Sequence, residues 1–132
     1  TPENNNFTLK GKSGRILFAD DNAVNMMVIS DFLGECGYHI VQARDGIEAL
    51  KMAQEHKPDI ILMDIQMPQL NGYEVINQLR SKKEFTATPI IALTALAMPG
   101  DRERCLEAGA NEYMSKPIGL KTLVEVIERL LG

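Results

Sequence analysis

Five polar residues placed at wide intervals along this chain have side chains suited to binding phosphate and a divalent metal ion. Asp20 and Asp21 follow the first short apolar run, Asp64 and Thr94 end later runs, and Lys116 follows the last run. Three carboxylates brought together repel one another and become protonated unless a cation neutralises them. Mg²⁺ suits an all-oxygen site of this kind, because it binds one or two carboxylates together with waters and phosphate oxygens. Lys116 would then neutralise phosphoryl oxygens from the opposite side.

Each of these residues taken alone has an ordinary structural explanation, since Asp often caps a helix and Lys or Thr often faces solvent. The hypothesis rests on their joint placement. The chain contains neither a GxxxxGK[ST] loop nor a GxGxxG fingerprint, so the phosphate is not expected to belong to a bound nucleotide. An Asp carboxylate can itself act as the nucleophile and form an aspartyl phosphate.

The apolar runs that precede the polar residues predict five β-strands. They lie at residues 16–19, 39–41, 60–63 and 90–93, with a weaker run around 113–114. The third and fourth runs are apolar at successive positions, as expected for parallel strands covered by helices on both faces. In a parallel sheet the carboxyl ends of the strands converge on one crevice, where α/β proteins bind ligands. The five polar residues are therefore expected to meet there.

Helical patterns separate the predicted strands and give a β-α unit repeated five times. The last helix has the apolar spacing i, i+3, i+4, i+7, i+11, formed by Leu120, Leu123, Val124, Ile127 and Leu131. The first helix opens with Asp21-Asn22 as a cap, stops at Gly37, and has four apolar residues on one face: Val24, Met27, Val28 and Phe32. We therefore predict an α/β doubly wound (βα)5 sandwich.

Length and charge narrow the function classes. The 132 residues fit one domain, with a polar linker at 1–14 and the folded domain at 15–132. A net charge of -4 with scattered Lys and Arg argues against nucleic-acid binding. No apolar run approaches the ~20 residues needed to cross a bilayer, so we expect no membrane contact and a cytoplasmic setting. Cys36 and Cys105 are far apart and form neither a redox pair nor a zinc motif.

Four sequence blocks resemble the receiver domains of two-component response regulators. They are Asp20-Asp21-Asn22, the segment LMDIQMP at 62–68 with Gly72, the segment ALTA at 92–95, and the segment YMSKP at 113–117. The resemblance covers residues 15–131 in the right order and spacing. It implies a flavodoxin-like parallel sheet with strand order 2-1-3-4-5.

The resemblance also implies roles for individual residues. Asp64 would be the phosphoacceptor, and Mg²⁺ would be held by Asp20, Asp21, Asp64 and the Gln66 main-chain carbonyl. Gln66 and Leu96 would flank the path of a water that hydrolyses the phosphoryl group.

Three further residues complete the site that the resemblance implies. Lys116 would pair with the phosphoryl group, and its peptide bond to Pro117 would be cis. Thr94 would hydrogen-bond a phosphoryl oxygen, and Tyr113 would change rotamer as Thr94 moves. The domain would be a signalling switch that helps to catalyse its own phosphorylation and dephosphorylation.

The partner implied by the resemblance is a phosphohistidine on a histidine kinase or on a histidine phosphotransfer domain. Asp21-Asn22 followed by Asn25 resembles receivers attached to hybrid histidine kinases. The start at Thr1 and not at Met leaves room for fused kinase or output domains outside this segment.

Two other functions are less well supported by the residues. A phosphatase of the haloacid-dehalogenase type also has an Asp nucleophile after a parallel strand, but it uses a second Asp two residues later as general acid. Gln66 stands at that position and cannot deliver a proton. A binding module without chemistry would not need the complete set of acids, hydroxyl and amine.

Overall fold

The computed structural model describes residues 14–67, 69–95 and 98–132. The linker expected at 1–14 lies outside the described residues except for Gly14. The carbonyl of Gly14 accepts a hydrogen bond of 3.0 Å from the His39 N–H, next to the first residue pair of the sheet.

One parallel sheet of five strands forms the centre of the molecule. The strands are β1 (Arg15–Ala19), β2 (His39–Ala43), β3 (Ile60–Asp64), β4 (Ile90–Thr94) and β5 (Glu112–Ser115). Their order in the sheet is β2-β1-β3-β4-β5, and every neighbouring pair is parallel. The number of strands predicted from the apolar runs and the strand order implied by the resemblance are both confirmed.

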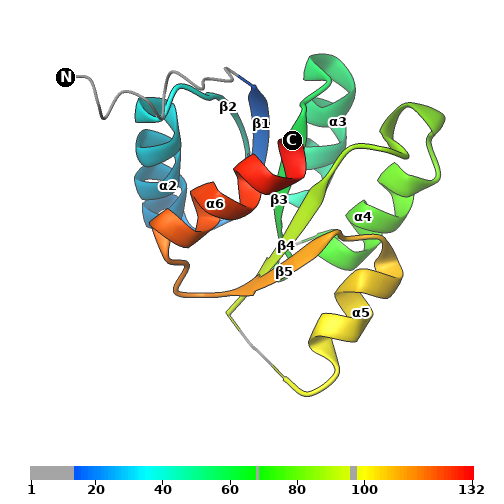
Figure 1. The fold of residues 1–132 in the computed structure, drawn as a ribbon. Coiled ribbons are helices and arrows are strands. Elements are labelled where there is room, and N and C mark those ends of the chain that lie inside the picture. The colour runs from blue at the N-terminus through cyan, green and yellow to red at the C-terminus, as the bar shows by residue number, and fades with distance from the viewer. Residues whose placement is uncertain (1–13, 68, 96–97) are drawn as a thin grey trace.

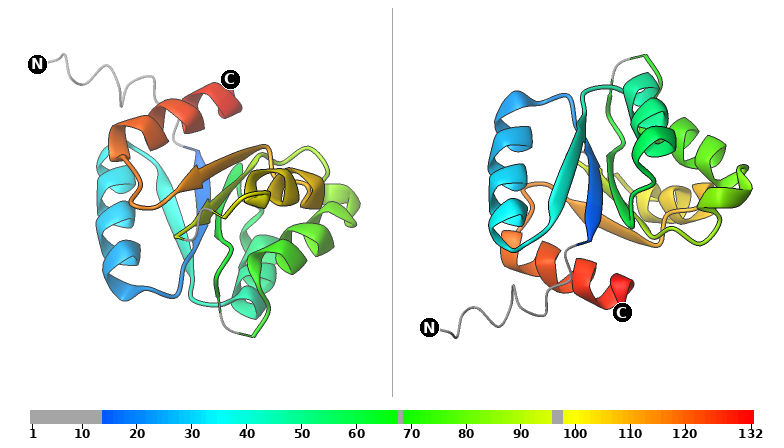
Figure 2. Two further views of the ribbon diagram at one scale, coloured as in Figure 1. Left: turned by 90° about the horizontal axis from the view of Figure 1, so that it is seen from below. Right: turned by 90° about the horizontal axis from the view of Figure 1, so that it is seen from above.

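Helices cover both faces of the sheet (Figure 1). They are α2 (Ala23–Glu35), α3 (Gly46–His56), α4 (Gly72–Arg80), α5 (Asp101–Ala108) and α6 (Leu120–Leu131), with a short 3-10 helix η1 (Lys83–Phe85) after α4. Figure 2 shows α2 and α6 together on one side of the sheet, and α3, α4 and α5 on the other. This is the doubly wound α/β arrangement that the alternating sequence patterns predict.

The apolar core consists of two layers, one on each face of the sheet. One layer lies under α3, α4 and α5 and the other under α2 and α6. All residues of β3 and β4 are buried, which explains why these two strands lack the alternation of half-exposed strands. In α6 the predicted stripe is confirmed, since Leu123, Val124 and Ile127 are buried.

The predicted contact face of the first helix was wrong. The residues of α2 that are buried against the sheet are Met26, Ile29 and Leu33. Val24 and Met27, expected on the apolar face, are 64% and 57% exposed. The predicted ends are confirmed, because Asn22 caps the helix through its side chain and Gly37 follows it with φ of 105°.

Arg80, at the end of α4, fixes the amino end of β4. Its guanidinium donates hydrogen bonds to the carbonyls of Gly109 (2.9 Å) and Thr88 (2.7 Å), and to Oδ1 of Asn111 (2.8 Å). The same Asn111 oxygen accepts from the N–H of Ile90, the first residue of β4, at 2.8 Å. A single side chain thus ties α4 to the segments that enter β4 and β5.

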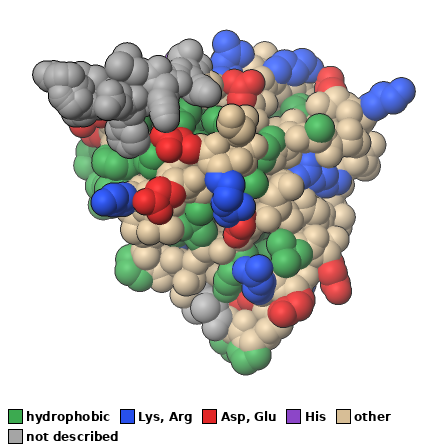
Figure 3. Space-filling view, viewed as in Figure 1, with side chains coloured by type: hydrophobic (Ala, Val, Ile, Leu, Met, Phe, Trp, Pro, Cys, Tyr) green, Lys and Arg blue, Asp and Glu red, His purple; other side chains and the backbone are tan. Residues whose placement is uncertain are grey.

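Within the described ranges, no helix is long and apolar enough to cross a membrane. On the face seen in Figure 3, side chains of Lys, Arg, Asp and Glu are interspersed. The described residues on that face form no concentrated basic patch of the kind that binds nucleic acid.

Candidate functional site

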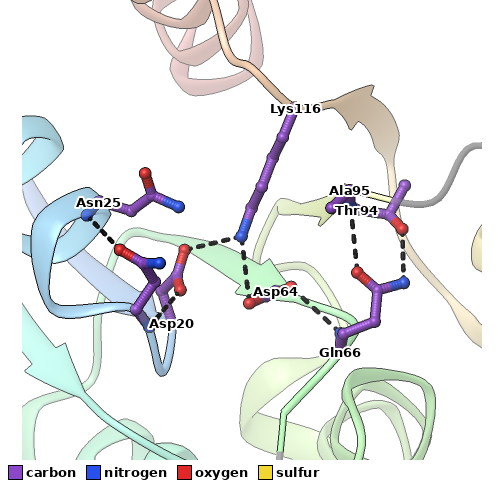
Figure 4. Close-up of polar contacts among 8 residues, drawn as sticks. Asp20, Asn25, Asp64, Gln66, Thr94, Ala95 and Lys116 are labelled. Carbon is purple, nitrogen blue, oxygen red and sulfur yellow. Dashed lines mark hydrogen bonds and ion pairs between the residues drawn. The ribbon is translucent and has the colours of Figure 1, made fainter.

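The polar residues singled out from the sequence meet at the carboxyl edge of the sheet. Asp20 follows β1, Asp64 ends β3, Thr94 ends β4 and Lys116 follows β5 (Figure 4). Three of these side chains are almost completely buried, with exposures of 0% for Asp20, 2% for Asp64 and 1% for Thr94. Buried carboxylates require partners, and each one here has them.

Lys116 places its ammonium between the two buried carboxylates. Its Nζ lies 3.0 Å from Oδ2 of Asp20 and 3.2 Å from Oδ2 of Asp64, and 15% of the side chain is exposed. Its main-chain N–H donates to the carbonyl of Thr94 at 2.7 Å. The peptide bond from Lys116 to Pro117 is cis, as the resemblance implied.

The backbone just after each strand orients the second oxygen of each carboxylate. Oδ1 of Asp20 accepts from the N–H of Asn22 at 2.8 Å, and Oδ1 of Asp64 accepts from the N–H of Gln66 at 3.1 Å. In both cases an Asp bonds the backbone two residues later, which is the Asx-turn that this residue type favours. These turns hold both Oδ2 atoms toward Lys116.

Gly72 allows α4 to begin directly beside the end of β3. A Cβ atom at this position would lie 2.6 Å from the Asp64 carbonyl oxygen and 2.7 Å from Cα of Ile65. Such distances to backbone atoms cannot be relieved by a side-chain rotation, so glycine is required by packing. The Gly72 N–H donates to the Ile65 carbonyl at 3.0 Å, which closes the loop after Asp64.

Burial raises the pKa of Asp64 from 3.8 to about 6, and repulsion by Asp20 adds to the rise while Lys116 and the Gln66 N–H oppose it. For Lys116, burial lowers the pKa, but its hydrogen bond to Asp20 and the charges of Asp64 and Asp20 outweigh burial, so the pKa is raised. The ammonium therefore keeps its proton, whereas Asp64 holds a negative charge at an energetic cost.

Three carboxylates at this edge fit a divalent cation. One oxygen each from Asp20, Asp21 and Asp64 lie within 4.8 Å of one another. Asp20 and Asp64 are buried, while Asp21 is exposed. Hard oxygen donors with high negative charge and access to water suit Mg²⁺.

The structure thus brings together Asp20, Asp21, Asp64, Thr94 and Lys116, all expected from the sequence to meet. Gln66 also lies in the cluster, but its side chain makes contacts that the sequence did not predict: Nε2 donates to Oγ1 of Thr94 at 2.6 Å, and Oε1 accepts from the N–H of Ala95 at 3.1 Å. The sequence feature that could have indicated these contacts is the long polar side chain two residues after Asp64.

Tyr113 stands apart from the polar cluster. It lies on β5 opposite Ala92 of β4, and it packs against the core layer under α3, α4 and α5. It is half-buried, so it borders both the core and the surface. Leu96, expected near the path of the attacking water, lies outside the described residues.

Comparisons with known proteins agree with this architecture. Residues 16–128 match the family model described as the response regulator receiver domain. The polar-differentiation response regulator DivK of Brucella anthropi is 43% identical over 117 residues, which cover 89% of this chain and 95% of that protein.

Solved structures of receiver domains are also similar to this chain. The receiver domain of sensor histidine kinase PA1611 from Pseudomonas aeruginosa superposes with a TM-score of 0.85 at 40% identity, covering 92% of this chain and 99% of that one. That structure has a magnesium ion coordinated in its active site cleft. The chemotaxis protein CheY4 of Vibrio cholerae gives a TM-score of 0.85 at 30% identity, covering 90% and 99% of the two chains.

A doubly wound parallel sheet with an acidic cluster at its carboxyl edge is the architecture of a two-component signalling module. The chain belongs to the response regulator receiver domain family of two-component signalling.

Proposed function

We propose that this receiver accepts a phosphoryl group on Asp64 from a phosphohistidine of a histidine kinase or a histidine phosphotransfer domain. The observation that carries the proposal is the placement of the Asp64 carboxylate beside two further acids and the Lys116 ammonium, at the carboxyl edge of a parallel sheet. A carboxylate in this setting has an exposed acid, Asp21, within 4.8 Å and a cation at 3.2 Å.

Each residue has a defined part in the proposed transfer. An Asp64 oxygen forms a bond to phosphorus while the bond from phosphorus to the histidine nitrogen breaks, and the nitrogen keeps the electron pair. Lys116 lies where its ammonium can pair with phosphoryl oxygens, and the Thr94 hydroxyl can donate to one of them.

Asp20, Asp21, Asp64 and the Gln66 main-chain carbonyl would hold Mg²⁺. When bound, Mg²⁺ would neutralise charge on the acids and on the transferring group. The magnesium in the cleft of the Pseudomonas receiver supports this assignment. Hydrolysis would later return Asp64 to its free form with help from the same residues, so the domain acts as a switch that shapes its own phosphorylation lifetime.

We further propose that the switch is read on the surface formed by α5, β5 and α6, through Thr94 and Tyr113. The likeness to a receiver of a sensor histidine kinase supports attachment to a hybrid kinase, with kinase or output domains outside this segment. The location proposed for such a domain is the cytoplasm. Lys and Arg are interspersed with Asp and Glu on the face seen in Figure 3, which supports a protein partner in preference to nucleic acid.

The direct test is phosphorylation by a small donor. Acetyl phosphate with Mg²⁺ is expected to add one phosphoryl group per chain, visible by intact mass spectrometry, and EDTA is expected to prevent the addition. Absence of modification by both acetyl phosphate and phosphoramidate in the presence of Mg²⁺ would contradict the proposal.

Lys116→Met is expected to retain Mg²⁺ binding and to tighten it by up to about tenfold. The ammonium lies between Asp20 and Asp64, and its removal leaves these two carboxylates without this counterion and with more attraction for a divalent cation. Titration calorimetry with MgCl₂ measures the change. The same variant should lose the conformational response to a phosphoryl mimic, because no cation then pairs with it from this side.

Lys121→Met, an exposed substitution at the start of α6, is the matched control for the loss of one positive charge. Lys121→Met should change neither the Mg²⁺ affinity nor the conformational response to the phosphoryl mimic. A collapse of Mg²⁺ affinity in Lys116→Met together with a normal response to the mimic would assign Lys116 a different role.

A further inference from the structure

The Gln66 side chain connects two strand ends that the proposed switch must move relative to each other. Its main-chain N–H binds the Asp64 carboxylate, whereas its carboxamide reaches across to the end of β4 (Figure 4). There Nε2 donates to Oγ1 of Thr94 at 2.6 Å, and Oε1 accepts from the N–H of Ala95 at 3.1 Å. These contacts join residues 28 and 29 positions apart in the chain.

We propose that the Gln66 carboxamide is a latch that holds the end of β4 in the unphosphorylated position and competes with the phosphoryl group for it. The proposal rests on phosphorylation of Asp64. Gln66 would be a positioning residue: its side chain acts through Thr94 and Ala95.

The competition follows from the hydrogen-bonding capacity of the groups involved. A phosphoryl group offers only acceptor oxygens, so it needs donors from the end of β4. The N–H of Ala95 carries a single hydrogen, which Oε1 of Gln66 already accepts. A phosphoryl oxygen can take this hydrogen only after the carboxamide has moved away. The hydroxyl of Thr94 must at the same time turn toward the phosphoryl group.

The released side chain has a place to go. Gln66 is exposed, and it lines a hollow of about 330 Å³ between the loop after β3 and the start of α5. Other polar residues lining this hollow are Asn71, Asp101 and Arg104. They offer the carboxamide new hydrogen-bond partners, so release leaves no buried polar group unpaired.

The latch raises the free energy of the switched conformation, but a phosphoryl group can still displace it. Hydrogen bonds to a charged phosphoryl oxygen are roughly twice as strong as the neutral bonds of the carboxamide. A phosphoryl group therefore displaces Gln66, whereas chance fluctuations of the unmodified protein do not. The side chain sets how rarely the switched conformation appears before phosphorylation.

Gln66→Met tests the latch, since Met keeps the length of the side chain and the main-chain carbonyl but removes both hydrogen bonds. Gln78→Met is the matched control, because Gln78 is exposed on α4 and remote from β4's end. With Mg²⁺ present, the apparent affinity for beryllofluoride, followed by NMR, is expected to rise about tenfold in Gln66→Met and to stay unchanged in the control.

A second readout needs neither metal nor phosphoryl mimic. In the free protein, the amide proton of Ala95 should exchange with solvent several-fold faster in Gln66→Met than in the wild type, because its acceptor is gone. Equal or weaker beryllofluoride affinity in Gln66→Met, or unchanged exchange at Ala95, would overturn the latch. If the wild type failed to bind beryllofluoride, the proposed phosphorylation would be overturned, and the exchange rate would still decide whether Gln66 holds β4.

Discussion

Asp64→Asn is expected to abolish phosphoryl transfer and, in the same molecule, to stabilise the metal-free fold. Loss of transfer follows because the amide is no nucleophile, while Asp20 is held by the Asn22 N–H and by Lys116. Intact mass after incubation with acetyl phosphate and Mg²⁺ should show no added phosphoryl group. Modification of this variant at the wild-type rate would place the phosphoacceptor elsewhere.

The gain in stability follows from the cost of the Asp64 charge. The pKa of Asp64 is raised from 3.8 to about 6, chiefly by burial, so the folded protein binds the proton more tightly than the unfolded chain does. This contribution to stability is fully present below about pH 4 and is lost as the pH rises to about 6. A pKa difference of about 2 corresponds to ~3 kcal/mol, so Asp64→Asn should gain about 1–3 kcal/mol at pH 7.5.

Urea unfolding in EDTA at pH 7.5 and at pH 5 measures this effect. The advantage of Asp64→Asn should shrink at pH 5, where Asp64 of the wild type is largely protonated. Mg²⁺ should stabilise the wild type more than the variant, because it neutralises the charge that the variant lacks. An advantage that is equal at both pH values would exclude the charge of Asp64 as its cause.

Thr94→Ala is expected to confine the response to phosphorylation to the acidic pocket. In the wild type, beryllofluoride with Mg²⁺ should shift backbone NMR signals from about residue 94 to residue 119, well beyond the residues it touches. The hydroxyl of Thr94 is the group that can draw the end of β4 toward the phosphoryl oxygen and free space for Tyr113. Without it, the shifts beyond the pocket should be lost while the mimic still binds.

Thr94→Ser is the matched control, because it keeps the hydroxyl and removes only a methyl group. It should retain most of the distant shifts. If Thr94→Ala left the shifts around Tyr113 and Gly119 unchanged, the hydroxyl would not couple the pocket to the α5, β5 and α6 surface, and that mechanism would have to be abandoned.

The sequence alone predicted the fold and most of the site because both depend on local patterns. Strands such as 60–63 and 90–93 are continuous apolar runs, and polar residues that directly follow such runs meet at one edge of a parallel sheet. The positions of Asp64 and Lys116 are therefore fixed by strand ends alone. Family resemblance added the cis peptide bond at Pro117 and the strand order, both found in the structure.

The buried face of α2 could not be chosen from periodicity. This helix carries apolar residues on more than one side, so both Val24-Met27-Val28 and Met26-Ile29-Leu33 follow helical spacing. Only the register of the helix against the sheet distinguishes them. In α6, by contrast, polar residues fill the outer face, and a single stripe remains.

The contacts of Gln66 and Arg80 were missed for another reason. Both side chains bond atoms that are brought near only by strand pairing, such as Thr94 for Gln66 and Gly109 for Arg80. Several of the acceptors are main-chain carbonyls, which carry no sequence signature. Long-range polar contacts of this kind emerge only once the sheet is assembled.

β4 is held at its amino end by the hydrogen bonds of Arg80 and Asn111. Its base, at Ile90, is held through Asn111, whereas its tip at Thr94 lies about 13 Å away along the strand. In the proposed switch a phosphoryl group would act on the tip, whereas the hydrogen bonds at the base would hold that end of the strand in the core. The tip is tied by the Thr94 carbonyl to the Lys116 N–H at 2.7 Å. A movement of this tip would therefore be passed on to the loop that leads to α6, so that the strand would be fixed at its base and movable at its tip.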